Sequence, residues 1–263
     1  MWSEVREYPS FVDAIFLVLL FIACQFVAGY FFGMVAWGTS RVITNVAGGI
    51  VNGLAFLAAM QFVFFRSGGD YSQTVGTQRF SSSSLPAVLL GVLGSSILIS
   101  ELDGILEQAL PVSGALKYWN DLFGNPKDLV GAILTLCVVA PITEEILFRG
   151  VILNGFLRNY RKLEALLLSS WLFAFMHLNP WQYAGAFLLG LLLGFLFIRT
   201  QSIIPSIICH SLFNATSVVG RRISHLPDIA IPFPWLTLNV LAVALVATSI
   251  VLLLRVTKRT TFK

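Results

Sequence analysis

Residues 143–149 read Thr143-Glu144-Glu145-Ile146-Leu147-Phe148-Arg149 and lie inside an apolar run of approximately residues 129–157. Ionisable side chains in hydrocarbon are costly, so the three in this run are functional candidates. Glu145 and Arg149 stand four residues apart with the acid first, which is the favoured order for an ion pair on a helix. Glu144 projects about 100° away from Glu145 around the helix, so it lacks this partner. The stretch predicts one neutralised and one free carboxylate.

The free carboxylate is the candidate for chemistry, because an unpaired acid in an apolar site can serve as a general base. Pro141 precedes Glu144 by three residues and removes a backbone donor, so a kink or local opening of the helix is expected there. An alternative interpretation is that the Glu145–Arg149 pair only locks this helix to a neighbour. That interpretation leaves Glu144 unexplained.

The composition predicts a polytopic membrane protein. The 263 residues are 57% hydrophobic and 11% charged, whereas a soluble domain carries about 25% charged residues. This length suits a single transmembrane domain over residues 1–263. The net charge is +4, and the basic residues sit at segment ends, which indicates topology and contact with anionic lipid rather than nucleic acid. The three cysteines, Cys24, Cys137 and Cys209, fall in apolar stretches and are interpreted as buried hydrophobic residues.

The fold class predicted is all-α, a membrane bundle of about eight transmembrane helices with an intramembrane active site. A spanning helix needs roughly 20 mainly apolar residues. The candidate runs are approximately 11–32, 43–65, 85–106, 129–157, 164–180, 182–198, 202–220 and 234–256. Only Asn179-Pro180 separates the fifth run from the sixth, so a tight turn is expected there. No cleavable signal is evident, and the first run is expected to be a retained helix.

Lys and Arg give an orientation. With eight spans and a cytoplasmic N-terminus, eleven basic residues fall on the cytoplasmic side and five on the far side, which the positive-inside rule favours. Both termini are therefore predicted in the cytoplasm, and in a prokaryote the membrane would be the plasma membrane. The cytoplasmic set is Arg6, Arg66, Arg79, Arg158, Arg161, Lys162, Arg199, Arg255, Lys258, Arg259 and Lys263; the far set is Arg41, Lys117, Lys127, Arg221 and Arg222.

Two further motifs carry polar groups at similar predicted depth. His177 follows Phe173 by one helical turn, so the ring of Phe173 can support the imidazole. His210 and Asn214 are also one turn apart and supply two donors of the kind that a developing oxyanion needs. Each motif alone is equally compatible with a packing or interhelical hydrogen-bonding role. Three motifs together favour one shared polar site.

The order Glu-Glu-x-x-x-Arg, Phe-x-x-x-His and His-x-x-x-Asn resembles the CPBP family, which comprises type II CAAX prenyl endopeptidases and bacteriocin-processing, Abi-like membrane proteins. The motifs lie within residues 129–220. The resemblance implies an eight-helix intramembrane protease in which Glu144 and His177 activate a water. It also implies that His210 and Asn214 bind the tetrahedral oxyanion. Glu145, Arg149 and Phe173 would support the site.

A metal is the open alternative for the chemistry. The Glu/His interpretation needs no metal and is favoured, whereas zinc would use Glu144, His177 and His210 with water in the fourth position. No His-Glu-x-x-His helix is present.

The expected partners are a peptide or membrane-protein substrate and membrane lipid. The family name does not fix the substrate, because prenylated CAAX proteins are not expected in a prokaryote. Two other functions compete with the endopeptidase. One is a catalytically silent scaffold or regulator of membrane proteins, and the other is a transporter, which would often show internal repeats.

Small and neutral polar residues were interpreted as packing elements. Gly190 and Gly194 form a G-x-x-x-G spacing, which is typical of close helix contact. Asn52, Gln25 and Ser95 were interpreted as interhelical donors.

Overall fold

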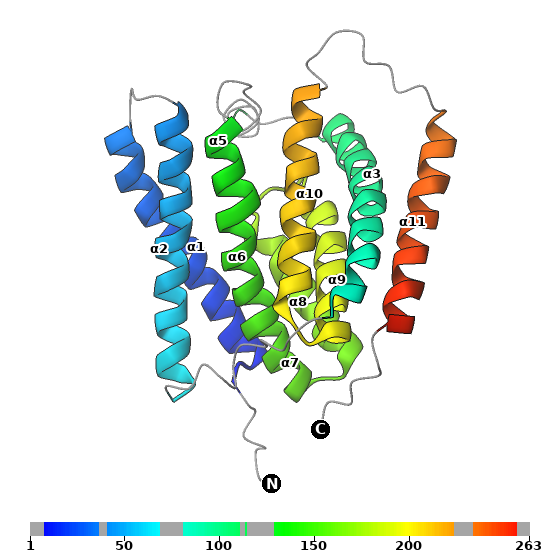
Figure 1. Cartoon of the computed structure of the whole chain (residues 1–263). Helices are drawn as coiled ribbons and strands as arrows, with labels where there is room; N and C mark the ends of the chain where they lie inside the picture. Colours follow the sequence, from blue (N-terminus) through cyan, green and yellow to red (C-terminus); the bar gives the residue numbers. More distant parts are fainter. Residues whose placement is uncertain are drawn as a thin grey trace.

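The protein is an all-α bundle (Figure 1). The computed structural model describes residues 8–36, 41–68, 81–110, 114, 129–223 and 234–256, and it holds no strand within them. Residues such as Arg6, Arg79, Lys117, Lys127 and Lys263 lie outside these ranges. The helices are α1 (Phe11–Ala36), α2 (Arg41–Arg66), η1 (Ser82–Ser84), α3 (Leu85–Ala109), α5 (Leu129–Ala132), η3 (Ile133–Val139), α6 (Ala140–Glu145), η4 (Ile146–Leu153), α7 (Asn154–Asn159), α8 (Lys162–Met176), α9 (Tyr183–Thr200), α10 (Ile203–Ile223) and α11 (Trp235–Val256).

Every predicted apolar run is helical. Within the described residues, seven helices are long and apolar enough to cross a membrane. The fifth run is the shorter α8, whose 15 residues extend only about 22 Å. It ends before the turn expected at Asn179-Pro180, where Leu178 adopts a φ of 49°. In Figure 1, α1 begins and α11 ends at the same end of the bundle.

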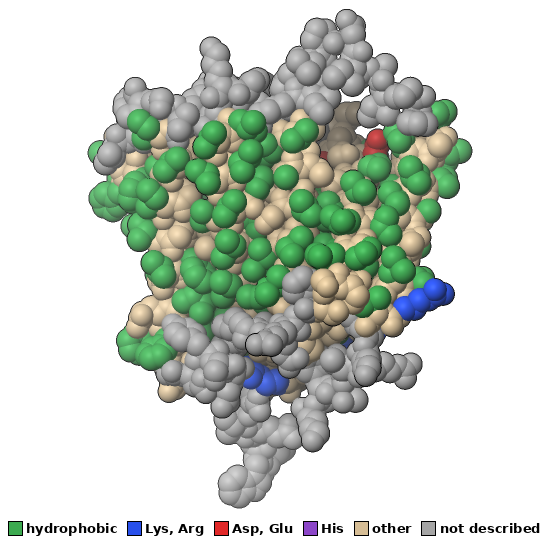
Figure 2. All heavy atoms as spheres, viewed as in Figure 1, with side chains coloured by type: hydrophobic (Ala, Val, Ile, Leu, Met, Phe, Trp, Pro, Cys, Tyr) green, Lys and Arg blue, Asp and Glu red, His purple; other side chains and the backbone are tan. Residues whose placement is uncertain are grey.

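The outer surface is apolar, as expected for a bundle surrounded by lipid. Hydrophobic side chains cover the middle of the face in Figure 2, and Lys and Arg side chains lie at its lower rim. Large residues such as Phe26, Tyr30 and Leu57 are more than half exposed. Helices can occupy such a medium because they satisfy their own backbone hydrogen bonds.

The segment from Leu129 to Asn159 is one long helix with two wide, π-helical stretches. The first, η3, ends at Val139, directly before the α6 residues that include Pro141. This is the local opening expected at that proline. The second, η4, begins at Ile146, directly after Glu145. π-Helical turns often occur at functional sites. Here the two π-helical stretches flank the short segment α6, which contains Glu144 and Glu145.

Helices α8 and α9 pack closely through glycines. A Cβ added to Gly190 would lie 3.1 Å from both Cα and Cβ of Ser170, and one added to Gly194 would lie 2.5 Å from Cδ1 of Leu166. The small-residue spacing therefore marks a real helix contact. The close approach also brings the α9 backbone to the centre of the bundle.

Tyr8 and Pro9, just before α1, contact α7. Pro9 lies against Gly155, where an added Cβ would be 2.1 Å from Cδ of the proline. The Tyr8 carbonyl accepts a hydrogen bond from Arg158 Nη2 at 3.1 Å, and the Pro9 carbonyl accepts one from Asn159 Nδ2 at 3.3 Å. These bonds join residues that are 150 positions apart in the chain.

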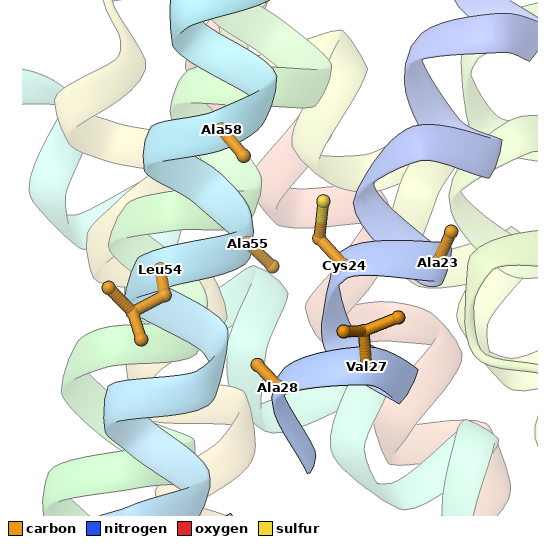
Figure 3. Close-up of a pocket in the computed structure, with 7 residues that line it drawn as sticks. All are labelled: Ala23, Cys24, Val27, Ala28, Leu54, Ala55 and Ala58. Carbon is orange, nitrogen blue, oxygen red and sulfur yellow. The ribbon is translucent and has the colours of Figure 1, made fainter. Parts of the chain in front are cut away.

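An apolar groove of about 340 Å³ lies between α1 and α2 (Figure 3). Small or apolar side chains line it, and none of the six ionisable or amide residues that the sequence singled out is among them. The lining residues are Ala23, Cys24, Val27, Ala28, Leu54, Ala55 and Ala58. The groove is thus distinct from the polar interior described next.

Candidate active site

Glu145 is the centre of a dry ionic cluster. Its Oε1 accepts a hydrogen bond from Arg149 Nη1 at 2.8 Å and one from His210 Nδ1 at 2.9 Å. The three side chains are between 0% and 3% exposed. The ion pair within the helix is the one that the four-residue spacing predicted. The contact with α10 could not be read from that spacing, because it depends on how the helices pack.

Arg149 is held by further groups. Its Nη2 donates to the Gly190 carbonyl on α9 at 3.1 Å, and its guanidinium lies 4.5 Å from the centre of the Phe173 ring. An Arg over an aromatic face gains a cation–π attraction, which is stronger when water is excluded. The close α8–α9 packing therefore supplies both the carbonyl and the ring that hold this cation.

Phe173 links the two histidines. Its ring centre lies 5.0 Å from that of His177 and 5.7 Å from that of His210, in both cases nearly edge-on. Phe173 itself is fully buried on α8. The prediction that it shares a helix face with His177 is confirmed, and it also orients the imidazole that comes from α10.

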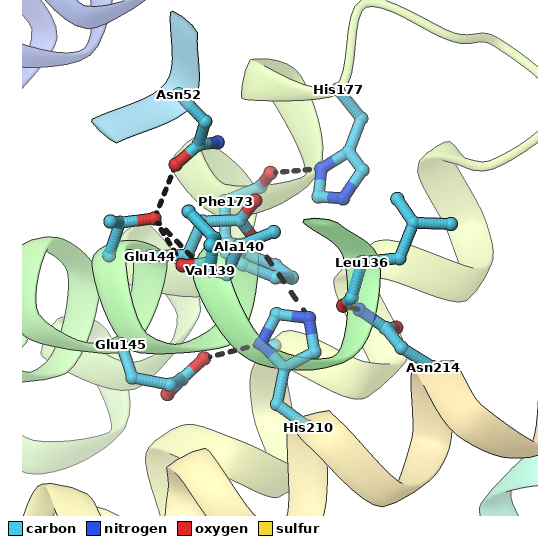
Figure 4. Close-up of polar contacts among 12 residues, drawn as sticks. Asn52, Leu136, Val139, Ala140, Glu144, Glu145, Phe173, His177, His210 and Asn214 are labelled. Atoms are coloured by element: carbon cyan, nitrogen blue, oxygen red, sulfur yellow. Dashed lines mark hydrogen bonds and ion pairs between the residues drawn. The ribbon is translucent and has the colours of Figure 1, made fainter. Parts of the chain in front are cut away.

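Glu144 differs from its neighbour. It is 8% exposed, and its nearest recorded polar partner among the described residues is His210 Nε2, 3.9 Å from Oε2. That separation is beyond ordinary hydrogen-bond range. One oxygen of Glu145 thus binds two partners, whereas neither oxygen of Glu144 has a partner at hydrogen-bond distance among the described residues (Figure 4).

The partner of each imidazole indicates its tautomer. His177 Nδ1 is 2.9 Å from the Phe173 carbonyl, which can only accept, so Nδ1 carries the proton. In neutral His177 the lone pair is then on Nε2. His210 Nδ1 lies 2.9 Å from Oε1 of Glu145, the same oxygen that accepts from Arg149, so this nitrogen also donates. His210 Nε2 can donate only when the ring is doubly protonated.

Asn214 reaches across to the helix that carries both glutamates. Its Nδ2 donates to the Leu136 carbonyl at 2.7 Å (Figure 4). A primary amide nitrogen has two hydrogens, so one remains for another acceptor. The carbonyl of Leu136 lies in η3, whose wide turns no simple periodicity would reveal.

Another polar contact joins the site helix to α2. Thr143 Oγ1 is 2.6 Å from Asn52 Oδ1 (Figure 4). The sequence predicts that Asn52 makes an interhelical contact, but it does not identify Thr143, directly before Glu144, as the partner. The sequence signal was an amide in the middle of an apolar run, which identifies the residue but not its partner.

The residues proposed as zinc ligands do not form a recognisable metal site. Zinc requires nitrogen and oxygen ligands about 2.0–2.2 Å from one centre. Within the described ranges, no three His, Cys, Asp or Glu side chains gather in a geometry that could hold a metal ion. Whether the protein uses a metal stays a prediction of the sequence, which favours the Glu/His route without one.

Comparison with known proteins gives one match. Residues 126–216 match the family described as "Type II CAAX prenyl endopeptidase Rce1-like". No curated protein and no solved structure matches the chain. The matched segment contains Glu144, Glu145, Arg149, and both histidines of the site. Over these residues the chain is therefore similar to the type II CAAX prenyl endopeptidases, a family of intramembrane proteases.

Proposed function

We propose that the chain is an intramembrane endopeptidase that hydrolyses a peptide bond of a membrane-associated or lipid-modified peptide, using a water activated by Glu144 and His177. The observation that carries this proposal is the unequal use of two adjacent buried glutamates. Glu145 binds Arg149 and His210, whereas Glu144 has no hydrogen-bond partner in the described part of the chain. A scaffold has no need for such a difference.

In the first step, Glu144 accepts a proton from a water, and the oxygen of that water attacks the carbonyl carbon of the substrate. His177 assists through Nε2, because its Nδ1 already donates to the Phe173 carbonyl. General bases act at hydrogen-bond range, roughly 2.6–3.2 Å, from the proton they remove. The site therefore needs room for one water between the carboxylate and this imidazole.

In the second step, the new oxyanion is stabilised by His210 and Asn214. Asn214 offers its remaining amide hydrogen, and His210 offers Nε2–H when the ring is protonated. Glu145 holds His210 through Nδ1 and is itself held by Arg149, so these two residues support the oxyanion site by fixing the position of the imidazole. Collapse of the intermediate breaks the C–N bond, and the proton held by Glu144 passes to the leaving amine.

A comparison of membrane proteomes tests the activity. Cells that produce the wild-type chain should contain new peptide termini, and cells that produce Glu144→Ala should lack them. Glu101→Gln is a matched control, because Glu101 lies on α3 and bonds Trp235 rather than the site. If all three cell lines give the same termini, the protein is a silent scaffold or regulator instead.

Chelation tests the metal-free route with the same protein. Purified enzyme should keep its activity after exhaustive treatment with a chelator, because Glu144 and His177 hold the water without zinc. Loss of activity that added zinc restores would instead make His210 a ligand and end the metal-free proposal.

We also propose that both termini lie in the cytoplasm, from the bias in basic residues. Reporter fusions after residue 263 and within residues 109–128 should report opposite sides of the membrane. Reports from the same side would show that the number of spans is wrong.

A further inference from the structure

The position of Glu144 depends on its backbone. Arg149 fixes the carboxylate of Glu145, but no group in the described chain holds that of Glu144 at hydrogen-bond distance. Glu144 lies in α6, a segment of six residues with a wide stretch on each side. Such stretches interrupt the regular backbone hydrogen bonding. Contacts between α6 and neighbouring helices therefore determine the direction of the Glu144 carboxylate.

Two lateral polar contacts flank Glu144: His210 binds Glu145 on one side, and Asn52 contacts Thr143 on the other. Thr143 Oγ1 lies 2.6 Å from Asn52 Oδ1, 2.9 Å from the Val139 carbonyl and 3.0 Å from the Ala140 carbonyl. A hydroxyl has one proton, so it cannot donate to three acceptors at once. Turning the amide by 180° resolves the conflict: Asn52 Nδ2 donates to Thr143, and Thr143 donates to one carbonyl. The two orientations look alike in heavy atoms, and both join Asn52 to the residue before Glu144.

The face of α2 that carries Asn52 lies close to the site helix over two turns. Thr135 Oγ1 donates to the Asn45 carbonyl at 2.6 Å. A Cβ added to Gly49 would lie 3.1 Å from the same Thr135 Oγ1. Asn45, Gly49 and Asn52 are spaced as one helix face. This face, the α2 seam, continues the contact to Thr143. The α2 seam thus contacts both η3 and α6.

We propose that Asn52 is a positioning residue of the active site: through Thr143 it fixes α6 and so directs the carboxylate of Glu144. Asn52 need not touch the substrate in this role. The effect on turnover rests on the proposed endopeptidase function. The effect on the Glu144 carboxylate does not, and the two are measured separately.

The test uses Asn52→Ala, Thr143→Val, the double variant and the conservative Thr143→Ser. Ser249→Ala is the matched control, because Ser249 Oγ donates to the Ala87 carbonyl at 2.6 Å between α11 and α3, away from the site. The first readout is the rate at which dicyclohexylcarbodiimide, a hydrophobic reagent for carboxyl groups, modifies Glu144 at one fixed pH. Mass spectrometry of the peptide distinguishes Glu144 from Glu145. The second readout is kcat and KM with a farnesylated CAAX peptide.

Asn52→Ala and Thr143→Val should each change the modification rate of Glu144 by about threefold or more, and the double variant should match the larger single effect, because both act through one contact. Thr143→Ser and Ser249→Ala should behave as wild type. Turnover should fall about 10- to 100-fold with KM unchanged. An unchanged modification rate in Asn52→Ala, or additive effects in the double variant, would overturn the proposal. Altered modification without cleavage of this peptide by wild type would support the positioning of Glu144 and count against the farnesylated peptide as the substrate.

Discussion

The polar interior has two unlike halves. Glu145, Arg149 and His210 form a cluster whose side chains are at most 3% exposed. In it, the Glu145 carboxylate binds both the Arg149 guanidinium and the His210 imidazole. Glu144 and His177 form the other half, where the carboxylate is 8% exposed and the imidazole is half-buried. The first half is built to stay as it is, and the second can accept a water and a substrate. The difference shows how two identical neighbouring side chains acquire different roles from their surroundings.

The largest effect is expected from Glu144→Gln, which removes the base from the open half. Peptide cleavage should be abolished, because an amide cannot take a proton from water. The amount of folded protein in the membrane should stay near the wild-type level, since no hydrogen bond is lost. Cleavage assays with purified protein and quantitative blots measure the two. A large loss of folded protein would show that Glu144 is structural.

Glu145→Gln should destabilise the buried cluster of Glu145, Arg149 and His210. Arg149 would be left without its counter-ion in an apolar setting, and breaking a buried pair costs about 3–5 kcal/mol. We expect a lower folded yield and lower activity together, measured by size-exclusion recovery and turnover. Normal yield and normal activity would remove the distinction between the two halves.

Asn214→Ala sharpens the comparison at the edge between the halves. Loss of one oxyanion donor typically lowers the rate about 100- to 1000-fold. The effect should appear in kcat, with little change in KM, because the donor acts mainly in the transition state. If KM rises while kcat stays constant, Asn214 binds the ground state of the substrate instead.

The smallest effect is expected from Gly190→Ala, which disturbs the α9 backbone that binds Arg149. The new methyl would press on the Ser170 backbone at 3.1 Å and shift the carbonyl that binds Arg149. Overpacking of this kind costs about 1–3 kcal/mol. The control is Gly29→Ala, where nothing lies within 4 Å of the added Cβ. Thermal unfolding in detergent should show a loss for the first variant only.

Features that depend on spacing within one helix were predictable from the sequence. The apolar runs, the Glu145–Arg149 pair, the shared face of Phe173 and His177, and the turn after His177 all follow from local rules. The close contact at Gly190 was likewise predictable from its spacing.

Features that depend on contacts between helices were not. The sharing of Glu145 by His210, the bond from Asn214 to the Leu136 carbonyl and the bond between Asn52 and Thr143 join separate helices. No pattern in one helix specifies the rotation of its neighbour. The wide stretches η3 and η4 also change the rotation of the site helix, so an ideal helical period misplaces residues beyond them. The catalytic roles of Glu144, His177, His210 and Asn214 and the supporting roles of Glu145, Arg149 and Phe173 stay predictions.

The docking of Pro9 on Gly155 has a consequence for biosynthesis. The partners of Tyr8 and Pro9 are made 150 residues later. At about 5–20 residues per second, this interval lasts roughly 8–30 s on the ribosome. Over that time Tyr8 and Pro9 lack these partners, although α1 and α2 can already pair within the membrane. Tyr8 and Pro9 are therefore held in place only after the helix with the two glutamates is complete, although they precede that helix in the chain.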